Sequence, residues 1–329
     1  MLRNLIAALV ATVSTVLVTV SPAQAQARNP LKVALTTWVG YGLLHLADRK
    51  GLFKANGADV ELITVQDKPS TAAAIATGRL DGWATTVDTF IFYNAQKIGA
   101  KQVLAVDFSK GGEGIISTND VKDVKDLKGH SIGAEEGSST YFFLLNVLAD
   151  AGLKVSDVKL QNMRAGDAGA AFVAGRLDAA ATWDPWLSQA GKRSGGRVLV
   201  DTKAKPGLIV DTVAFRADVL EKRPTDVAGV IKGYFAAYDY WKANPEESNK
   251  IMAEALGTKI EDFNSSLAGL EFVSREANKQ YFGTPSTPGE IAGVITRGIE
   301  FYRNLGLVKD AMDPKSVVDA APLNNVLKN

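Results

Sequence analysis

One short pattern occurs twice in the chain and sets its expected architecture. The tetrapeptide Gly-Arg-Leu-Asp stands at 78–81 and again at 175–178, which is 97 residues later. The run Val-Glu-Leu at 60–62 is matched by Val-Lys-Leu at 158–160, at an offset of 98. Each tetrapeptide follows an alanine-rich, helix-like run and precedes a short strand-like run. Two matches at nearly the same offset, in the same order of elements, predict two lobes of one architecture.

Apolar runs typical of buried strands alternate along the chain with runs of helical spacing. Short loops join them, and this alternation predicts mostly parallel sheets with helices on both faces. The expected strands cover residues 31–35, 60–65, 82–86, 102–108, 130–134, 158–163 and 179–182. The expected helices cover residues 43–53, 71–77, 90–98, 138–151 and 168–174, and the chain from 224 to 328 is expected to be mostly helical.

Two segments rich in glycine or proline are the expected crossings between the lobes. Phe108 to Gly114 contains three glycines, and Lys203 to Val210 contains a Pro-Gly pair. The alternative is that both are ordinary surface loops. As a pair, however, they bracket the second copy of the pattern, which favours a hinge. The expected lobes are residues 31–110 plus 211–329 for lobe 1, and residues 111–210 for lobe 2.

Residues 1–25 have the features of an export signal. Arg3 precedes an apolar stretch over 5–20, Ser21-Pro22 ends that stretch, and Ala23-Gln24-Ala25 supplies a small-x-small cleavage pattern. The stretch is shorter than the roughly 20 residues that a membrane-spanning helix needs. We therefore expect cleavage near Ala25 and a mature protein that works outside the cytoplasm and does not insert into the membrane. An uncleaved membrane anchor is the alternative.

Charge and residue types exclude several classes of function. Lys and Arg number 37 and Asp and Glu number 36, and Arg3 is the only charged residue in the expected signal, so the mature chain would be neutral. A neutral chain has no bulk attraction for nucleic acid. The chain has no cysteine and two histidines, His45 and His130, which excludes thiolate sites, disulfides and multi-histidine metal sites. We expect no nucleic-acid partner, no metal and no cofactor.

Motifs for catalysis are absent from the sequence. It contains no Gly-x-Ser-x-Gly elbow and no P-loop. The glycine cluster Gly111-Gly112-x-Gly114 follows an expected strand but lacks the full dinucleotide fingerprint. We therefore expect no catalytic residue and a protein that binds its ligand without converting it.

Ligands of doubly wound sheets bind beyond the carboxyl ends of the strands. The loops expected there are rich in aromatic and acidic residues, and their basic residues are mainly Lys68 and Lys110. Asp107, like Asp88, is either a ligand contact or a group that bridges the hinge, and Trp186 also fits a core anchor. The candidate ligand-binding residues are Trp38, Tyr41, Asp67, Thr86, Asp88, Glu113, Glu135, Glu136, Ser138, Ser139, Asp167, Trp183, Asp184 and Trp186.

Two features of these loops favour ligands of opposite charge. An expected helix begins at Ser138, and the free N–H groups of a helix N-terminus bind anions, although plain N-capping by Ser138 is the alternative. Glu135 and Glu136 directly precede this helix and would repel an anion. With Trp38 and Trp183 as flat walls, they suit a small cation or a guanidine- or amide-like molecule. The alternative is that one glutamate is solvated and the other caps the helix.

These motifs, in this order and spacing, resemble the substrate-binding proteins of bacterial ABC importers, in particular the nitrate/taurine/aliphatic-sulfonate family. The similarity covers residues 31 to about 256 and rests on Trp38-x-Gly-Tyr41, Gly51-Leu52-Phe53, Gly78-x-Leu80-Asp81, Gly137-Ser138-Ser139, Gly175-x-Leu177-Asp178 and Trp183-Asp184-Pro185. It implies an α/β, two-lobed periplasmic-binding-protein-like fold of type II with extra C-terminal helices. It also implies hinge closure over a small molecule and delivery to an ABC permease in the inner membrane by a monomeric receptor.

Several functions stay open on this fold. The first is an importer receptor for a small cation or a donor-rich neutral molecule, and its variant binds nitrate or an alkyl sulfonate such as taurine. The others are a pyrimidine-precursor enzyme and a sensory receptor. The export signal and the scarcity of histidine argue against the enzyme, whereas the sequence does not separate the importer receptor from the sensory receptor.

Overall fold

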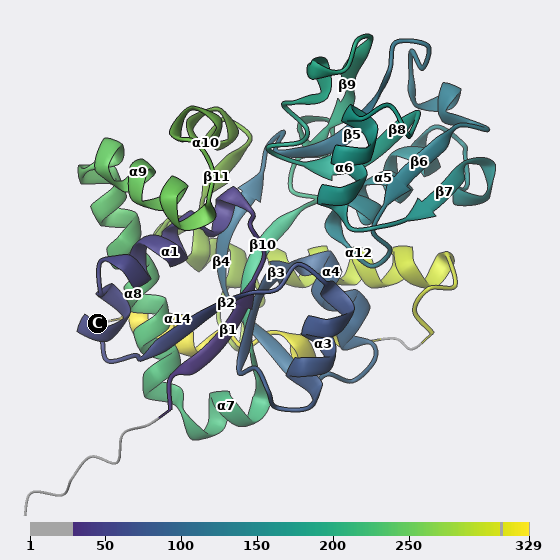
Figure 1. Ribbon diagram of the computed structural model, residues 1–329. Coiled ribbons are helices and arrows are strands. Elements are labelled where there is room, and N and C mark those ends of the chain that lie inside the picture. Colours follow the sequence, from purple (N-terminus) through teal and green to yellow (C-terminus); the bar gives the residue numbers. More distant parts are fainter. Residues whose placement is uncertain (1–28, 310–311, 329) are drawn as a thin grey trace, which may run out of the picture.

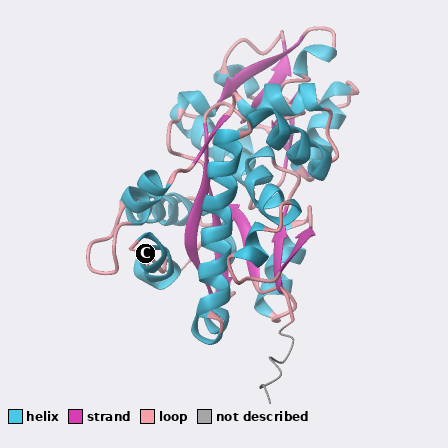
Figure 2. Cartoon of the chain, turned by 90° about the vertical axis from the view of Figure 1, so that its left-hand side faces the viewer, coloured by secondary structure: helices cyan, strands magenta, loops and turns pink. Residues whose placement is uncertain are grey.

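The computed structural model describes residues 29–309 and 312–328 of the chain. It contains two β-sheets, each flanked by helices (Figure 1). A view turned by 90° shows helices on both sides of the strands (Figure 2). The expected export signal, residues 1–25, lies outside the described residues. Within the described ranges, no helix is long and apolar enough to cross a membrane.

The first sheet has six strands in the order β11-β4-β10-β3-β1-β2. Strand β1 pairs in parallel with β2 and β3, whereas β10 runs antiparallel between β3 and β4, and β11 is antiparallel to β4. These strands are β1 (Leu31–Leu35), β2 (Val60–Thr64), β3 (Gly82–Thr86), β4 (Ala100–Ser109), β10 (Val210–Arg216) and β11 (Leu270–Phe272).

The second sheet has five strands in the order β7-β6-β8-β5-β9. Strand β6 pairs in parallel with β7 and β8, and β5 runs antiparallel between β8 and β9. These strands are β5 (Glu113–Thr118), β6 (Ser131–Ala134), β7 (Lys159–Asn162), β8 (Ala179–Trp183) and β9 (Gly196–Asp201). Both sheets are therefore mixed: three of the five pairings in the first sheet and two of the four in the second are antiparallel, whereas the alternation of strands and helices predicted mostly parallel sheets.

The two sheets share one topology. The order β10-β3-β1-β2 in the first corresponds to β5-β8-β6-β7 in the second, with the same parallel and antiparallel pairings. The aspartates of the repeated tetrapeptide play the same part in both. Asp81 accepts a hydrogen bond from the Lys32 N–H, and Asp178 accepts one from the Ser131 N–H, each at 2.9 Å. Both aspartates thus join the turn before a strand to the central parallel strand of their sheet.

Up to residue 174 a helix lies at each expected place and in the expected order, but one expected helix is divided in two and several helix ends differ. The helix expected over 43–53 is divided, because Gly51 adopts a left-handed conformation with φ 67°. The helix expected over 90–98 begins at Val87, so that Asp88 lies in its first turn and not in a loop. The helices are α1 (Gly42–Arg49), α2 (Leu52–Ala55), α3 (Lys68–Ala76), α4 (Val87–Asn94), α5 (Ser139–Asp150), α6 (Ala165–Val173), α7 (Ala217–Lys222), α8 (Pro224–Ala243), α9 (Pro245–Leu256), α10 (Ile260–Leu267), α11 (Arg275–Phe282), α12 (Glu290–Asn304), α13 (Pro314–Val317) and α14 (Ala321–Leu327).

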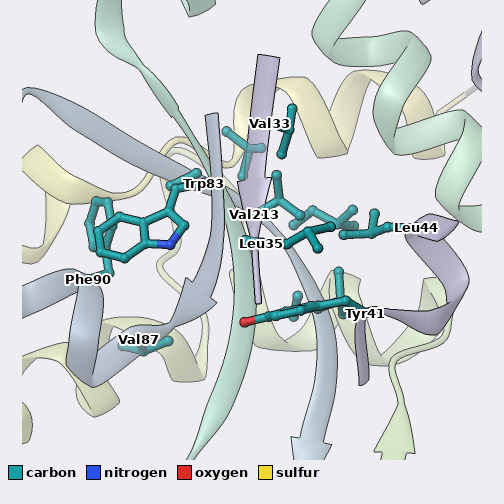
Figure 3. Packing of buried hydrophobic residues seen from close by; sticks show 14 of the residues in the cluster. Val33, Leu35, Tyr41, Leu44, Trp83, Val87, Phe90 and Val213 are labelled. Carbon is teal, nitrogen blue, oxygen red and sulfur yellow. The ribbon is translucent and has the colours of Figure 1, made fainter. Parts of the chain in front are cut away.

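The core of the first sheet fixes the position of Tyr41. This residue ends a short 3₁₀ helix, Val39–Tyr41, just before α1. Leu35 and Leu44 pack near its ring, and the hydroxyl points toward the strands, whereas Trp83 and Phe90 pack on the other side of the sheet (Figure 3). All five side chains are buried. The apolar contacts therefore hold the Tyr41 hydroxyl at the carboxyl end of the sheet.

The two chain crossings between the sheets are bonded to each other. The first, residues 110–112, connects β4 to β5, and the second, residues 202–209, connects β9 to β10. The Thr202 hydroxyl lies 2.8 Å from the Ser109 hydroxyl and accepts a hydrogen bond of 2.7 Å from the Gly111 N–H. Gly112 donates to the Gly269 carbonyl and accepts from the Asp184 N–H, both at 2.9 Å. The first crossing is thus tied to both sheets.

Gly112 has no room for a side chain. A Cβ there would lie 2.5 Å from Cη2 of Trp38 and 3.0 Å from the Gly269 carbonyl oxygen. We expect Gly112→Ala to lower the free energy of unfolding by about 1–3 kcal/mol in urea titrations, as overpacking does. Gly191→Ala is the control, because Gly191 has no atom within 4 Å of such a Cβ. If Gly112→Ala lowered the free energy of unfolding no more than Gly191→Ala does, the crossing would tolerate a side chain at this position.

Candidate functional site

Five carboxylates and one ammonium are buried between the two sheets, and none of these side chains is more than 5% exposed. They come from α3, α4, β4 and β10 on one side and from β5 and the loop after β6 on the other. Lys68 lies within electrostatic reach of four of the carboxylates. The fifth, Asp107, lies within electrostatic reach of Asp211 and Glu113. This acidic cluster consists of Lys68, Asp88, Asp107, Glu113, Glu135 and Asp211.

Two aromatic side chains hold the cluster on the side of the first sheet. The Trp38 indole N–H donates to both carboxylate oxygens of Asp107, at 3.2 and 3.3 Å. The Tyr41 hydroxyl donates to Asp211. Trp38 and Tyr41 are themselves buried, so their polar atoms are engaged with the protein. The structure therefore places them behind the carboxylates, where they position Asp107 and Asp211.

The start of α5 supports the cluster on the side of the second sheet. The Ser138 hydroxyl accepts a hydrogen bond of 3.3 Å from the Tyr141 N–H and donates one of 2.7 Å to the Glu135 carbonyl, so Ser138 is the N-cap of α5. The Ser139 hydroxyl donates to the Glu113 carboxylate. The N-terminus of this helix therefore already has a carboxylate beside it, where an external anion would otherwise bind.

Three carboxylates of the cluster have one oxygen engaged and the other free. Asp88 accepts from the Thr89 hydroxyl at 3.3 Å, Glu113 from Ser139, and Glu135 from the Ala165 N–H at 3.3 Å. Buried polar atoms are almost always paired, so unpaired ones point to a missing partner. In the cluster, the buried oxygens without a hydrogen-bond partner among the described residues are Asp88 Oδ1, Glu113 Oε2 and Glu135 Oε1.

Burial and mutual repulsion shift the protonation of the cluster. Burial, followed by the charge of Asp211, raises the pKa of Glu113 to about 8. Burial raises the pKa of Asp88 to about 6, although nearby hydroxyl groups oppose the shift. Burial also raises the pKa of Asp107 and of Asp211, which lie beside each other. The cluster therefore holds protons at neutral pH, on Glu113 in particular, that a separated carboxylate would have released.

Trp183 borders the cluster at Lys68. It ends β8 and is 8% exposed, and the ammonium of Lys68 lies 5.6 Å from the centre of its ring. That distance is within the range of a cation–π contact. Because Lys68 begins α3 and Trp183 belongs to the second sheet, this contact connects the two halves of the molecule.

Several predicted site residues lie outside the cluster. Glu136 is exposed, and Asp167 is exposed and paired with Arg164 at 2.8 Å. Asp67 is the N-cap of α3 and accepts from the Ser70 N–H at 2.9 Å. These three carboxylates therefore have solvent or structural partners.

The other three predicted residues support the walls of the site. The Thr86 hydroxyl donates to the Thr89 hydroxyl at 2.8 Å and so supports the first turn of α4. Asp184 accepts from the N–H and the hydroxyl of Ser188, at 2.9 and 2.5 Å, and thereby holds the loop after β8. Trp186 is half-buried against α6. A Cβ added to Gly169 of that helix would lie 2.4 Å from the Cβ of Trp186.

Three residues of the cluster were not among the predicted ligand-binding residues. Asp107 was weighed but not selected. Asp211 stands in an otherwise apolar or hydroxyl-bearing run, Ile209 to Val213, which is an unusual place for a carboxylate and was a usable signal. Lys68 lies between the N-cap Asp67 and a proline, and nothing in the local sequence indicates that its side chain is buried. Across the described chain, no group of three or more histidine or carboxylate side chains is arranged to hold a metal ion.

Comparisons with known proteins agree with this architecture. The model of the NMT1-like family matches residues 24–257. The "Putative aliphatic sulfonates-binding protein" of Escherichia coli (strain K12) is 33% identical over 193 residues, which cover 57% of this chain and 60% of the relative. The taurine-binding periplasmic protein of the same organism is 25% identical over 297 residues, covering 87% of this chain and 89% of the relative.

Solved structures share the fold. The periplasmic aliphatic sulphonate binding protein SsuA of Escherichia coli has a TM-score of 0.72 at 23% identity, covering 92% of this chain and 100% of that one. The desulfurization enzyme DSZB has a TM-score of 0.66 at 15% identity, covering 92% of this chain and 99% of that one. The predicted two-lobed periplasmic-binding-protein-like fold is confirmed, and the fold by itself occurs in both binding proteins and an enzyme.

The raised pKa values make the stability of the protein depend on pH. An acid whose pKa is higher in the folded state stabilises that state while it is protonated, and this contribution is lost as the pH rises from its ordinary pKa to its raised one. For Glu113 and Asp88 this window runs from about pH 4 up to about 8 and 6. We expect the free energy of unfolding to fall from pH 5 to pH 8, by up to about 1.4 kcal/mol per pH unit for each such group.

Glu113→Gln removes one of these groups and is expected to flatten the decline, as measured by urea unfolding at several pH values. Glu136→Gln is the control, because Glu136 is exposed to solvent. A profile for Glu113→Gln as steep as that of the wild type would mean that Glu113 is not buried beside the other carboxylates.

Proposed function

The chain belongs to the NMT1-like family, and from this premise and the acidic cluster we infer that it is a solute-binding receptor of an ABC importer whose ligand is a small cation. In this proposal the receptor works as a monomer in the periplasm, closes over its ligand and delivers it to a permease in the inner membrane. It does not convert the ligand. Relatives named for the binding of sulfonates and taurine support the receptor role.

The excess of carboxylates over ammonium groups in the cluster carries the proposal for the ligand. An anion about 4 Å from a single ionised carboxylate is repelled by about 4 kcal/mol at an effective dielectric constant of about 20. A cation gains the same interaction with the opposite sign. The free oxygens of Asp88, Glu113 and Glu135 also need hydrogen-bond donors, which an anion such as nitrate does not have.

Guanidinium and its small derivatives have the required chemistry. A guanidinium group is flat and positively charged, and its N–H donors lie in one plane, which suits carboxylates placed around it. Its face can stack on the Trp183 ring, which borders the cluster. We therefore propose a guanidinium-like cation as the ligand, with Asp88, Glu113 and Glu135 as acceptors and Trp183 as the wall.

A sulfonate is the second candidate, because the cluster also has features that favour an anion. The helices α3, α4, α5 and α6 each begin within or beside the cluster, and the partial positive charge at the N-terminus of a helix attracts negative charge. Lys68 adds an ammonium. With Glu113 and its neighbours protonated, these groups could hold the anionic end of a molecule such as taurine. The two candidates predict opposite effects of pH on affinity.

The boundaries of the moving parts are also a proposal. We propose lobe 1 as residues 31–110 plus 211–329, lobe 2 as residues 111–210, and hinge segments at 109–114 and 205–210. The composition of the two sheets supports this division, because every strand of the second sheet lies between residues 113 and 201. The cluster takes groups from both lobes, so a ligand bound there would be enclosed only when the lobes are closed.

Affinity for guanidinium is expected to rise with pH. A cation binds the ionised cluster, so below the raised pKa of Glu113, about 8, binding must release a proton. We expect guanidinium to bind with a dissociation constant in the millimolar range or below. This constant is expected to fall by up to about tenfold per pH unit between pH 6 and pH 8. Calorimetry in two buffers of different ionisation enthalpy measures the released proton. Affinity for methanesulfonate that rises as the pH falls would instead favour the sulfonate.

Removal of a single carboxylate charge is expected to weaken the binding of guanidinium. Glu113→Gln and Glu135→Gln each delete a charge and a free acceptor oxygen, and we expect a loss of about tenfold or more at pH 8, measured by calorimetry. Glu136→Gln, made in an exposed residue next to Glu135, is the matched control and should bind as the wild type does. Unchanged affinity in both cluster variants would contradict the proposed ligand.

A further inference from the structure

Lys68 is a buried lysine without a direct ionic partner. It is the first residue of α3 and is 5% exposed, but among the described residues no carboxylate makes an ion pair with it. Buried charges are normally paired, because burial without a partner is unfavourable. The ammonium instead lies 5.6 Å from the centre of the Trp183 ring.

Carboxylates face Lys68 from several directions. Glu135 follows β6, Asp211 lies on β10, Glu113 on β5 and Asp88 in α4. Burial lowers the pKa of Lys68, and the negative charge of each of these carboxylates opposes that shift. Asp67, directly before Lys68, caps α3 and acts on Glu135. The ammonium is therefore held by the summed field of these groups and not by one contact.

We propose that Lys68 is a tethered counter-ion whose ammonium stands in for the positive charge of the ligand when the site is empty, and that a cationic ligand displaces it. This inference rests on the cationic ligand proposed above. Two cations in one small site repel each other, so guanidinium can approach the free oxygens of Glu113 and Asp88 only if the ammonium moves away. The flexible four-carbon side chain of lysine permits that movement.

The tether also has a structural consequence for the empty protein. Lys68 begins a helix of the first half, whereas Trp183, Glu113 and Glu135 belong to the second. Its attraction for these groups keeps the two halves together in the absence of ligand. Without it, the carboxylates of the two halves repel each other. Lys68 thereby sets both the affinity for a cation and the closure of the empty receptor.

Substitution of Lys68 tests the competition. We expect Lys68→Met to bind guanidinium about tenfold or more tightly than the wild type at pH 8, because one competing charge is gone. Lys68→Arg keeps the charge and is expected to restore affinity to near the wild-type value. The control is Lys110→Met, which removes the same charge from an exposed ion pair with Glu271. Equal or weaker binding of guanidinium by Lys68→Met overturns the proposal.

Small-angle scattering of the ligand-free proteins tests the tether without any ligand. At pH 8 we expect a larger radius of gyration for Lys68→Met than for the wild type and Lys110→Met. At pH 5, where protons reduce the repulsion between carboxylates, we expect the difference to shrink. An unchanged radius at pH 8 overturns the proposal.

The scattering experiment also separates the two proposals. If the wild type binds methanesulfonate but not guanidinium, the proposed ligand fails, and the radius of ligand-free Lys68→Met still decides the role of Lys68. If Lys68→Met does not fold, as judged by circular dichroism, Lys68→Gln replaces it in both measurements.

Discussion

Repulsion between buried carboxylates is the interaction on which the rest of this structure depends. Asp88, Asp107, Glu113, Glu135 and Asp211 occupy one buried space, and charges in such a space interact far more strongly than in water. The protein reduces this repulsion by protonation, by hydrogen bonds and by one ammonium. These devices leave part of the negative charge of the cluster without a partner, and the proposal of a cationic ligand rests on that remainder.

The hydrogen bonds around the cluster show how the fold supports unfavourable groups. Trp38 and Tyr41 donate to Asp107 and Asp211 from behind, on the side of the hydrophobic core. Ser139 donates to Glu113 from the start of α5. These donors come from rigid elements, a 3₁₀ helix packed on a sheet and the capped end of a helix. The positions of the carboxylates are therefore set by packing before any ligand binds.

The repeated topology explains why the cluster draws on both halves of the chain. In each sheet the carboxyl ends of the parallel strands point to the same edge, and the two edges face each other across the crossings at 110–112 and 202–209. Ligand sites of open α/β sheets form at such edges. The Thr202 hydroxyl and the packing of Trp38 against Gly112 hold the crossings together at this place. The site is thus a product of two copies of one supersecondary unit placed edge to edge.

The sequence by itself determined the fold class and most of the elements, because both follow from local pattern. The repeat of Gly-Arg-Leu-Asp, the alternation of strands and helices, and the ends of β1 and β3 were read from neighbouring residues, and the acidic character of the loops was visible in their composition. The antiparallel insertion of β10 and β5 was not predicted, since their pairing joins segments far apart in the chain.

Only the tertiary structure decided which acids share the site. Glu113 and Glu135 are buried in it, whereas Glu136, in the loop before α5, and Asp167, in the first turn of α6, face solvent although they are of the same chemical type. Consecutive residues of a loop point in different directions, so one side chain can lie in the cluster while the next faces solvent. The composition of a loop carries no information about these directions. Lys68, Asp107 and Asp211 joined the cluster for the same reason, because burial of a charged group depends on partners from other strands and not on its own neighbours in sequence.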